Sequence, residues 1–113
     1  SPVVCADDPE FKSGPRVGAM LPEARIGDGY LTGKLGAGFS VLVFDKRLAN
    51  DLDIAGVAVI LIDAESEVAQ QFGARQSSAY LVRPDLHIAA RLFDATPATI
   101  QHALRFAAGE VLP

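Results

Sequence analysis

The single cysteine, Cys5, is the first side chain in this sequence that could act as a nucleophile or a redox centre. It cannot form an internal disulfide, and it has neither a CxxC partner nor a histidine at metal-ligand spacing. A thiol becomes reactive when a neighbouring base, cation or helix N-terminus lowers its pKa. Because Cys5 is far in sequence from any such group, we predict an unactivated free thiol in a reducing compartment, the cytoplasm.

The two histidines, His87 and His102, are the side chains best suited to metal binding or acid–base catalysis. Neither has a cysteine, aspartate or glutamate at the spacing of a metal site. A histidine without such neighbours most often has a structural role. We therefore predict structural roles for both residues and no metal site.

Two aspartates, Asp45 and Asp63, each follow an apolar run. Ligands of open α/β sheets bind at the carboxyl ends of strands, so both carboxylates are candidates for binding. An aspartate in this place also caps the following helix, and we favour the cap for both. The five glycines within residues 27–38 lack the strand, GxGxxG and helix order of a phosphate loop, so we assign them to turns.

The composition indicates one folded domain and excludes two classes of partner. Half of the 113 residues are hydrophobic, and the formal net charge is −4. Nucleic-acid binding needs clustered Lys and Arg to neutralise phosphates, whereas the ten in this chain are scattered. The longest apolar run, residues 54–62, is too short to cross a bilayer. We therefore predict neither a nucleic-acid partner nor a membrane partner.

Two apolar runs predict neighbouring strands of a parallel sheet. Residues 39–44 and 57–62 are apolar on both faces, which is typical of buried central strands. Between them, Leu48, Ala49 and Leu52 form a short helical stripe. This stripe predicts the crossover helix that two parallel strands need.

A second helix and a hairpin follow the parallel strands. Residues 68–72 carry a helical apolar stripe that ends at Gly73. Residues 79–92 contain two β-prone runs around Arg83-Pro84-Asp85-Leu86. Proline presets the φ angle of a turn and aspartate can bond back to the backbone, so this stretch predicts a β-hairpin.

The two ends of the chain differ in pattern. A last helix is predicted from Thr96 as N-cap to a stop at Gly109, with an apolar face formed by Ile100, Ala103, Leu104 and Ala107.

A small hairpin is expected around a turn at residues 27–29. Residues 1–13 show no periodicity and predict a linker or arm, followed by a domain over residues 14–113.

The predicted order is a β-hairpin, then β-α-β-α-β-β-α, which indicates an α/β fold with a thioredoxin-like mixed sheet and helices on both faces. In redox-active proteins of this kind, the reactive cysteines follow the first central strand. This chain has Asp45-Lys46-Arg47 there, lacks CxxC, and has no proline in residues 75–79 before the hairpin strand. We therefore predict a redox-inactive domain with no catalytic, cofactor-binding or metal-binding residue.

Three stretches of the chain carry more specific information. They are Gly14-Pro15-Arg16-Val17-Gly18, Leu-Gly-Ala-Gly-Phe-Ser-Val-Leu at 35–42, and Tyr-Leu-Val-Arg-Pro-Asp-Leu-His-Ile-Ala at 80–89. Over residues 14–109, the chain resembles the C-terminal domain of the FAD-dependent aromatic-ring monooxygenases. That family includes phenol hydroxylase, 3-(3-hydroxyphenyl)propionate hydroxylase and the hydroxylases of aromatic polyketides. Its C-terminal domain is thioredoxin-like and lacks the cysteines.

The resemblance implies a non-catalytic accessory domain whose partner is the catalytic FAD domain of the same polypeptide, with contacts in a homo-oligomer in some members. FAD, NAD(P)H and the phenolic substrate would be handled by the preceding domains. The parent protein would thus be an oxidoreductase, while this domain would hold no cofactor. The family usually has glycine after Pro-Asp, whereas this chain has Leu86, so the turn type is left open.

Two hypotheses about function follow from the sequence. The first is an accessory domain, for packing or oligomerisation, of a flavin-dependent aromatic hydroxylase. The second is a free-standing, redox-inactive, thioredoxin-like module for binding or assembly. The full open reading frame distinguishes them, because a GxGxxG motif some hundreds of residues upstream supports the first and a start codon just before Ser1 supports the second.

Overall fold

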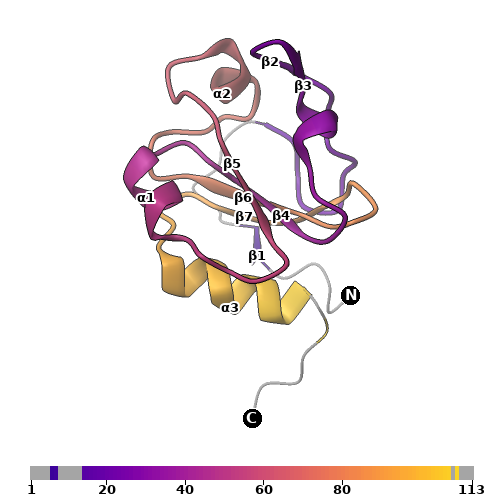
Figure 1. Cartoon of the computed structure of the whole chain (residues 1–113), viewed down its shortest axis with the longest axis vertical. Coiled ribbons are helices and arrows are strands. Elements are labelled where there is room, and N and C mark those ends of the chain that lie inside the picture. The colour runs from indigo at the N-terminus through magenta and orange to yellow at the C-terminus, as the bar shows by residue number, and fades with distance from the viewer. Residues whose placement is uncertain (1–5, 8–13, 108, 110–113) are drawn as a thin grey trace.

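The centre of the structure, a computed structural model that describes residues 6–7, 14–107 and 109, is a five-stranded sheet. The strand order is β1-β7-β6-β4-β5 (Figure 1). The strands are β1 (Ala6–Asp7), β4 (Ser40–Val43), β5 (Ala58–Leu61), β6 (Ala79–Val82) and β7 (Ile88–Leu92). This is the mixed sheet that the sequence predicts, and its order is compatible with a thioredoxin-like fold.

Strand β4 lies inside the sheet, between β6 and β5, whereas its parallel partner β5 is at one edge. β4 pairs in parallel with β5 and antiparallel with β6, and all four of its residues are buried. β5 is the last strand on its side of the sheet, and within it only Ile60 is buried. The expectation that residues 57–62 form a buried central strand is therefore wrong. An apolar run reports what lies above and below a strand, not whether another strand lies beside it.

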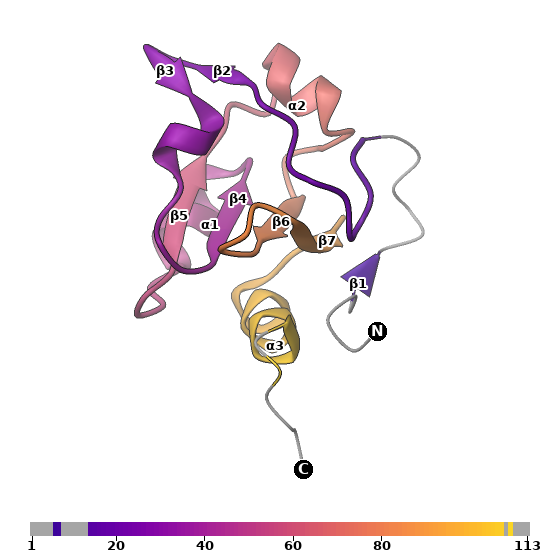
Figure 2. The same ribbon diagram turned by 90° about the vertical axis from the view of Figure 1, so that its right-hand side faces the viewer.

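Helices cover both faces of the sheet, as predicted (Figure 2). One face carries α1 (Lys46–Asp51) and α3 (Pro97–Ala107), which bury Leu48 and Ile100 against β4 and β6. The opposite face carries α2 (Glu67–Gln71), the 3₁₀ helix η1 (Leu31–Lys34) and the hairpin β2 (Arg25–Ile26) and β3 (Gly29–Tyr30). Among the described residues, no helix is long and apolar enough to span a membrane.

The ends of α3 match the sequence prediction closely. The Thr99 backbone N–H donates to Thr96 Oγ1 at 3.1 Å, which confirms Thr96 as the N-cap. The buried residues of the helix are Ile100, Ala103, Leu104 and Ala107, the predicted apolar face. Gly109 has a φ of 80°, a conformation in which glycine ends a helix at no steric cost.

The hairpin β6–β7 is confirmed, and its turn holds Leu86 in an unusual conformation. The Leu86 N–H donates to the Arg83 carbonyl at 2.9 Å, and the Arg83 N–H donates to the His87 carbonyl at 2.8 Å. Leu86 has a φ of 69°, the left-handed region that favours glycine. The turn therefore keeps a geometry suited to glycine although this chain has leucine at the position.

We expect Leu86→Gly to stabilise the chain by about 0.5 to 1 kcal/mol, because a side chain in the left-handed region is strained and glycine is not. Leu86 is only half-buried and is not among the residues packed in either apolar cluster, so little packing would be lost. The midpoint of urea denaturation measures the change. Destabilisation by this substitution would mean that the leucine side chain contributes more than its strain costs.

The segment from Gly14 to Leu21 joins the sheet beside this hairpin. The Gly18 N–H donates to the Ile88 carbonyl at 2.8 Å, and the Leu21 N–H donates to the Leu86 carbonyl at 2.7 Å. Farther toward the N-terminus, β1 pairs in parallel with β7. Ala6–Asp7 lie within the predicted linker of residues 1–13, so part of that stretch belongs to the sheet. The boundary of the domain at residue 14 stays a prediction.

The small hairpin β2–β3 is also confirmed. Arg25 pairs with Tyr30 and Ile26 pairs with Gly29, which places Gly27 and Asp28 in the turn. Only Gly27 of this turn takes a positive φ, 58°. The hairpin lies over the same face of the sheet as α2, where Leu31 after it is fully buried.

Candidate functional site

The carboxyl ends of β4 and β5 border a hollow of about 890 Å³, at the place where the redox centre of a thioredoxin-like fold would lie. Its lining is mixed: Phe44, Leu61 and Ile62 are apolar, whereas Lys46, Asp63, Glu65 and Arg75 are charged. The residues at the start of α1 are Asp45-Lys46-Arg47, none of which carries a thiol or a hydroxyl group. Cys5 lies outside the described residues, so the structure does not place it.

The two aspartates at this edge bind backbone N–H groups. Asp45 Oδ1 accepts from the Arg47 N–H at 3.0 Å, which confirms Asp45 as the N-cap of α1. Asp63 Oδ1 accepts from the Glu65 N–H at 2.9 Å, but the N-cap of α2 is Ser66. The cap predicted at Asp63 is therefore wrong: Asp63 holds the turn before the helix, three residues too early to cap it.

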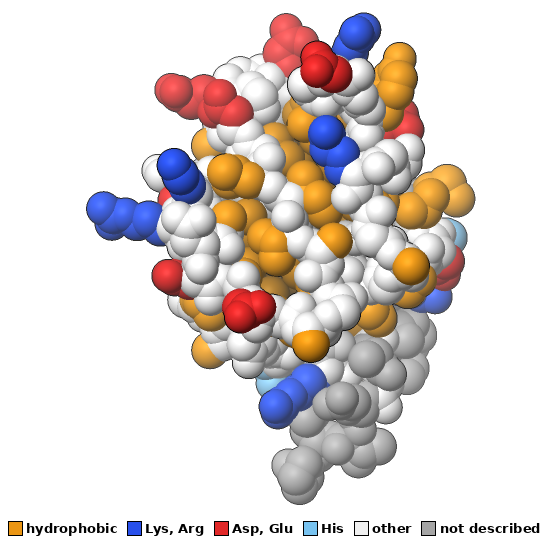
Figure 3. All heavy atoms as spheres, in the orientation of Figure 1, with side chains coloured by type: hydrophobic (Ala, Val, Ile, Leu, Met, Phe, Trp, Pro, Cys, Tyr) orange, Lys and Arg blue, Asp and Glu red, His pale blue; other side chains and the backbone are white. Residues whose placement is uncertain are grey.

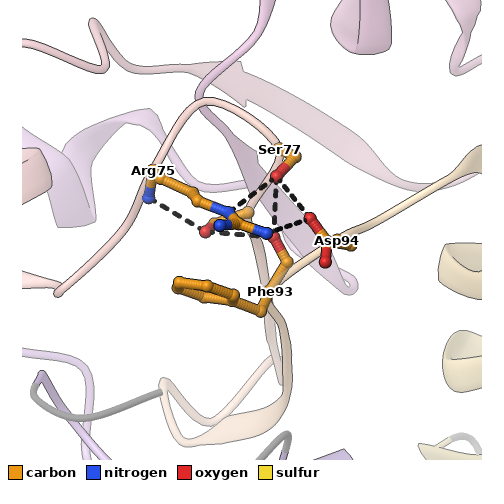
Figure 4. A network of polar contacts seen from close by, with 5 residues as sticks. Arg75, Ser77, Phe93 and Asp94 are labelled. Atoms are coloured by element: carbon orange, nitrogen blue, oxygen red, sulfur yellow. Dashed lines mark hydrogen bonds and ion pairs between the residues drawn. The ribbon is translucent and has the colours of Figure 1, made fainter. Parts of the chain in front are cut away.

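A polar network next to the hollow joins the entry of β6 to the exit of β7 (Figure 4). The Arg75 guanidinium makes an ion pair with Asp94 and lies over the ring of Phe93, 4.0 Å from its centroid. The Ser77 hydroxyl lies 2.9 Å from Asp94 Oδ1 and 3.0 Å from the Phe93 carbonyl. The network thus links residues that are 16 to 19 positions apart in the sequence.

The electrostatics of this network are those of a structural ion pair. Hydrogen bonds from Arg75 and then Ser77 hold the pKa of the Asp94 carboxyl below its ordinary value of 3.8. A lowered pKa makes this carboxylate a weaker base, which disfavours it as an activator of the Ser77 hydroxyl. Both charged side chains are at least half exposed, so solvent screens the pair. We therefore assign the network to positioning the loops at this edge.

The structure does not bring the two histidines together. His87 lies at the β6–β7 turn, where its Nδ1 is 3.3 Å from Asp85 Oδ1, and His102 is exposed on α3. Burial pushes the pKa of Asp85 upward, but the His87 backbone N–H, the Arg83 guanidinium and the His87 ring together hold it below its ordinary value. In the part of the chain that the structure describes, no group of three or more potential metal ligands is found.

The most distinctive surface of the molecule is apolar. Figure 3 shows hydrophobic side chains gathered in the middle of the face on which β5 lies in Figure 1, with charged side chains around them. Leu61 of β5 is 45% exposed, and Val57 and Val59 are half-buried. Sequence reasoning missed this surface because it placed β5 inside the sheet. The only hint was that the run at residues 54–62 is apolar throughout.

The geometry therefore defines a class: a mixed α/β domain with a polar network beside a hollow at the carboxyl ends of β4 and β5, and an apolar surface at one edge of its sheet. No family model matches the chain, and no curated protein matches its sequence. Solved structures do match its fold, and the three described next are flavin-containing enzymes.

Three of these structures illustrate the match. The flavin-dependent monooxygenase PieE, in complex with FAD and substrate, is 25% identical with a TM-score of 0.60. Aklavinone-11 hydroxylase, with FAD and aklavinone, is 22% identical with a TM-score of 0.65. The rebeccamycin biosynthetic enzyme RebC, with reduced flavin, is 24% identical with a TM-score of 0.69.

The match covers nearly all of this chain but a small part of each of those enzymes. It spans 91% of this chain in PieE, 97% in aklavinone-11 hydroxylase and 98% in RebC. This chain in turn covers 21%, 26% and 22% of those chains. It therefore corresponds in fold to one domain of enzymes that are about four times as long.

Proposed function

We propose that this chain is a non-catalytic accessory domain of an FAD- and NAD(P)H-dependent aromatic hydroxylase, similar to 3-(3-hydroxyphenyl)propionate hydroxylase. The observation that carries the proposal is the match of 91–98% of this chain to a fifth or a quarter of flavin-containing enzymes. Asp45, Asp63 and Asp94 at the carboxyl edge of its sheet also favour a structural role, because their carboxylates accept hydrogen bonds from backbone N–H groups or from the Ser77 hydroxyl.

The proposal assigns the chemistry to the rest of the parent polypeptide. When bound there, FAD would supply the oxygen-activating chemistry, and this chain would contact and stabilise the flavin-binding part without holding the cofactor itself. Its packing would also support oligomerisation of the parent, an oxidoreductase of the cytoplasm. We do not propose the other hypothesis from the sequence, a free-standing assembly module, because the matched enzymes are about four times as long as this chain.

Deleting this domain from the full-length parent should lower its thermal stability or solubility, or change its oligomeric state, while flavin binding by the remainder is largely kept. The physical reason is that deletion exposes the apolar surface that the domain covers. Size-exclusion chromatography with detection of flavin absorbance, followed by thermal melting, measures all of these quantities. The isolated chain serves as the control, and it should be colourless and should not retain added FAD.

Two results would contradict the proposal. If the truncated parent keeps its mass, its melting temperature and its hydroxylation rate, the domain has no accessory role. If the truncated parent folds normally but loses its flavin, the domain takes part in cofactor binding.

A further inference from the structure

The outer edge of β5 presents backbone groups with no partner among the described residues. The Ala58 N–H donates to the Phe39 carbonyl at 3.2 Å, and the Ile62 N–H donates to the Val43 carbonyl at 2.8 Å, so these residues bond to β4 and its ends. Because backbone groups alternate in direction along a strand, those of Val59 and Leu61 point away from β4. β5 is terminal in the strand order, so no strand of the described sheet lies on that side.

Two apolar grooves flank this edge. One groove, of about 430 Å³, lies between α3 and the segment that leads into the N-terminal end of β5. It includes Phe39, Ile54, Val57 and Leu104. The other, of about 170 Å³, lies between β5, α2 and the β2–β3 hairpin and includes Ile26, Leu61 and Val68. Charged side chains border them, Asp53 and Arg105 at the first and Arg25 and Asp63 at the second. An apolar centre with a charged rim is the usual anatomy of a protein interface.

The edge of β5 lacks three of the features by which sheets avoid pairing with other chains: lysine, proline and a bulge. Proteins protect an edge strand with lysine, proline, a bulge or a very short strand. The residues of β5 are Ala-Val-Ile-Leu, with no charge and no proline, and the pairing with β4 is regular over all four. An unprotected apolar edge indicates a surface that is covered in the functional protein.

We propose that the flavin-binding part of the same polypeptide docks on the open edge of β5, where it accepts and donates hydrogen bonds at Val59 and Leu61 and fills the two grooves. This inference rests on the proposed function, since it names the surface through which the accessory domain acts. The matched structures are about four times as long as this chain, so in them a larger body is tethered to the corresponding fold.

A tethered occupant fits this surface better than a second copy of the chain does. A stable interface between separate proteins buries about 1,200 to 2,000 Å². On this short strand, only Val59 and Leu61 offer outward backbone groups. So few hydrogen bonds add little to the stability of an interface between two separate chains. Tethering raises the effective concentration of the partner, so a smaller surface suffices within one polypeptide.

Amide hydrogen exchange resolved to single residues tests the proposal directly. The Val59 and Leu61 amides should exchange rapidly in the isolated chain and at least about tenfold more slowly in the full-length parent. The Ala58 amide on the same strand and the Ile62 amide directly after it are matched controls, because their hydrogen bonds to Phe39 and Val43 are expected in both proteins. They should be protected in both.

A charge at the edge should abolish the added protection. Leu61→Lys in the full-length parent should return the Val59 amide to within about twofold of its rate in the isolated chain, because a lysine placed on the edge opposes strand pairing. Met20→Lys is the matched control, since Met20 is 62% exposed and lies beside His87 at the β6–β7 turn, away from both grooves. Both variants of the isolated chain should keep its melting temperature, which excludes simple unfolding as the cause.

The outcomes separate this inference from the proposed function. Protection of Val59 and Leu61 that appears in the isolated chain and rises with its concentration would mean that a second copy covers the edge. Rapid exchange in the full-length parent, with deletion of the domain still lowering the stability of that parent, would mean that docking uses another face. If the deletion has no effect and the edge exchanges rapidly, both the inference and the proposed function are wrong.

Discussion

Phe72→Ala is expected to lower the free energy of unfolding by about 3 to 5 kcal/mol, the range for removing a buried phenylalanine from a core. Phe72 is 0% exposed and packs in the apolar cluster between the sheet and α2. Its ring meets that of Tyr80 edge-on, with 5.0 Å between the centroids and 87° between the planes. Alanine would remove this contact and leave a cavity, because the neighbouring backbone cannot collapse into the space.

Urea denaturation of the isolated chain measures this loss. Phe106→Ala is the matched control, because Phe106 is 38% exposed on α3 and its truncation leaves no enclosed cavity. We expect that variant to lose about 1 kcal/mol or less. Equal losses in the two variants would show that enclosure of Phe72 contributes nothing beyond its size.

Gly14→Ala should destabilise the chain by about 3 kcal/mol or more, through two separate effects. Gly14 has a φ of 90°, where an L side chain is strained. A Cβ atom added to Gly14 would lie closer to the Phe72 carbonyl oxygen than any real contact allows, and 2.9 Å from the Tyr80 hydroxyl. The Tyr80 hydroxyl donates to that same carbonyl, so the substitution would also disturb a buried hydrogen bond.

Gly18→Ala separates the two effects. Gly18 has nearly the same φ, 91°, but an added Cβ atom there meets nothing within 4 Å. We therefore expect only the conformational cost, about 1 to 2 kcal/mol. The difference between the two variants in denaturation midpoint measures the steric overlap at Gly14. If both lose the same free energy, the chain relieves that overlap by a small movement.

These two predictions give a physical reason for the Gly14-Pro15-Arg16-Val17-Gly18 motif. Gly14 allows the backbone to approach Phe72 and Tyr80, and the Pro15 carbonyl accepts from the buried Arg91 side chain at 3.0 Å. Gly18 then begins the backbone pairing with Ile88. The motif therefore fixes the N-terminal segment against β6 and β7.

Much of the fold could be predicted from the sequence because the decisive interactions are local. Thr96 caps α3 through a residue three positions away, and the apolar face of that helix follows from its period alone. The β6–β7 hairpin was predicted because Pro84 and Asp85 specify a turn within four residues. The turn type at Leu86 was left open by the sequence, and the structure gives that residue a positive φ of 69°.

Other features were decided only by the tertiary structure, since they depend on which distant segments meet. Arg75 and Asp94 lie 19 positions apart, and only the return of β7 beside β6 makes them partners. The carboxylate of Asp63 binds the turn rather than capping α2, because the helix begins at Glu67, three residues later than a cap at Asp63 requires. Hydrophobicity along β5 reports burial by the layers above and below, whereas its position at the edge depends on strand order. The sequence by itself therefore determined the elements and their faces, and the packing of those elements determined which edge stayed open.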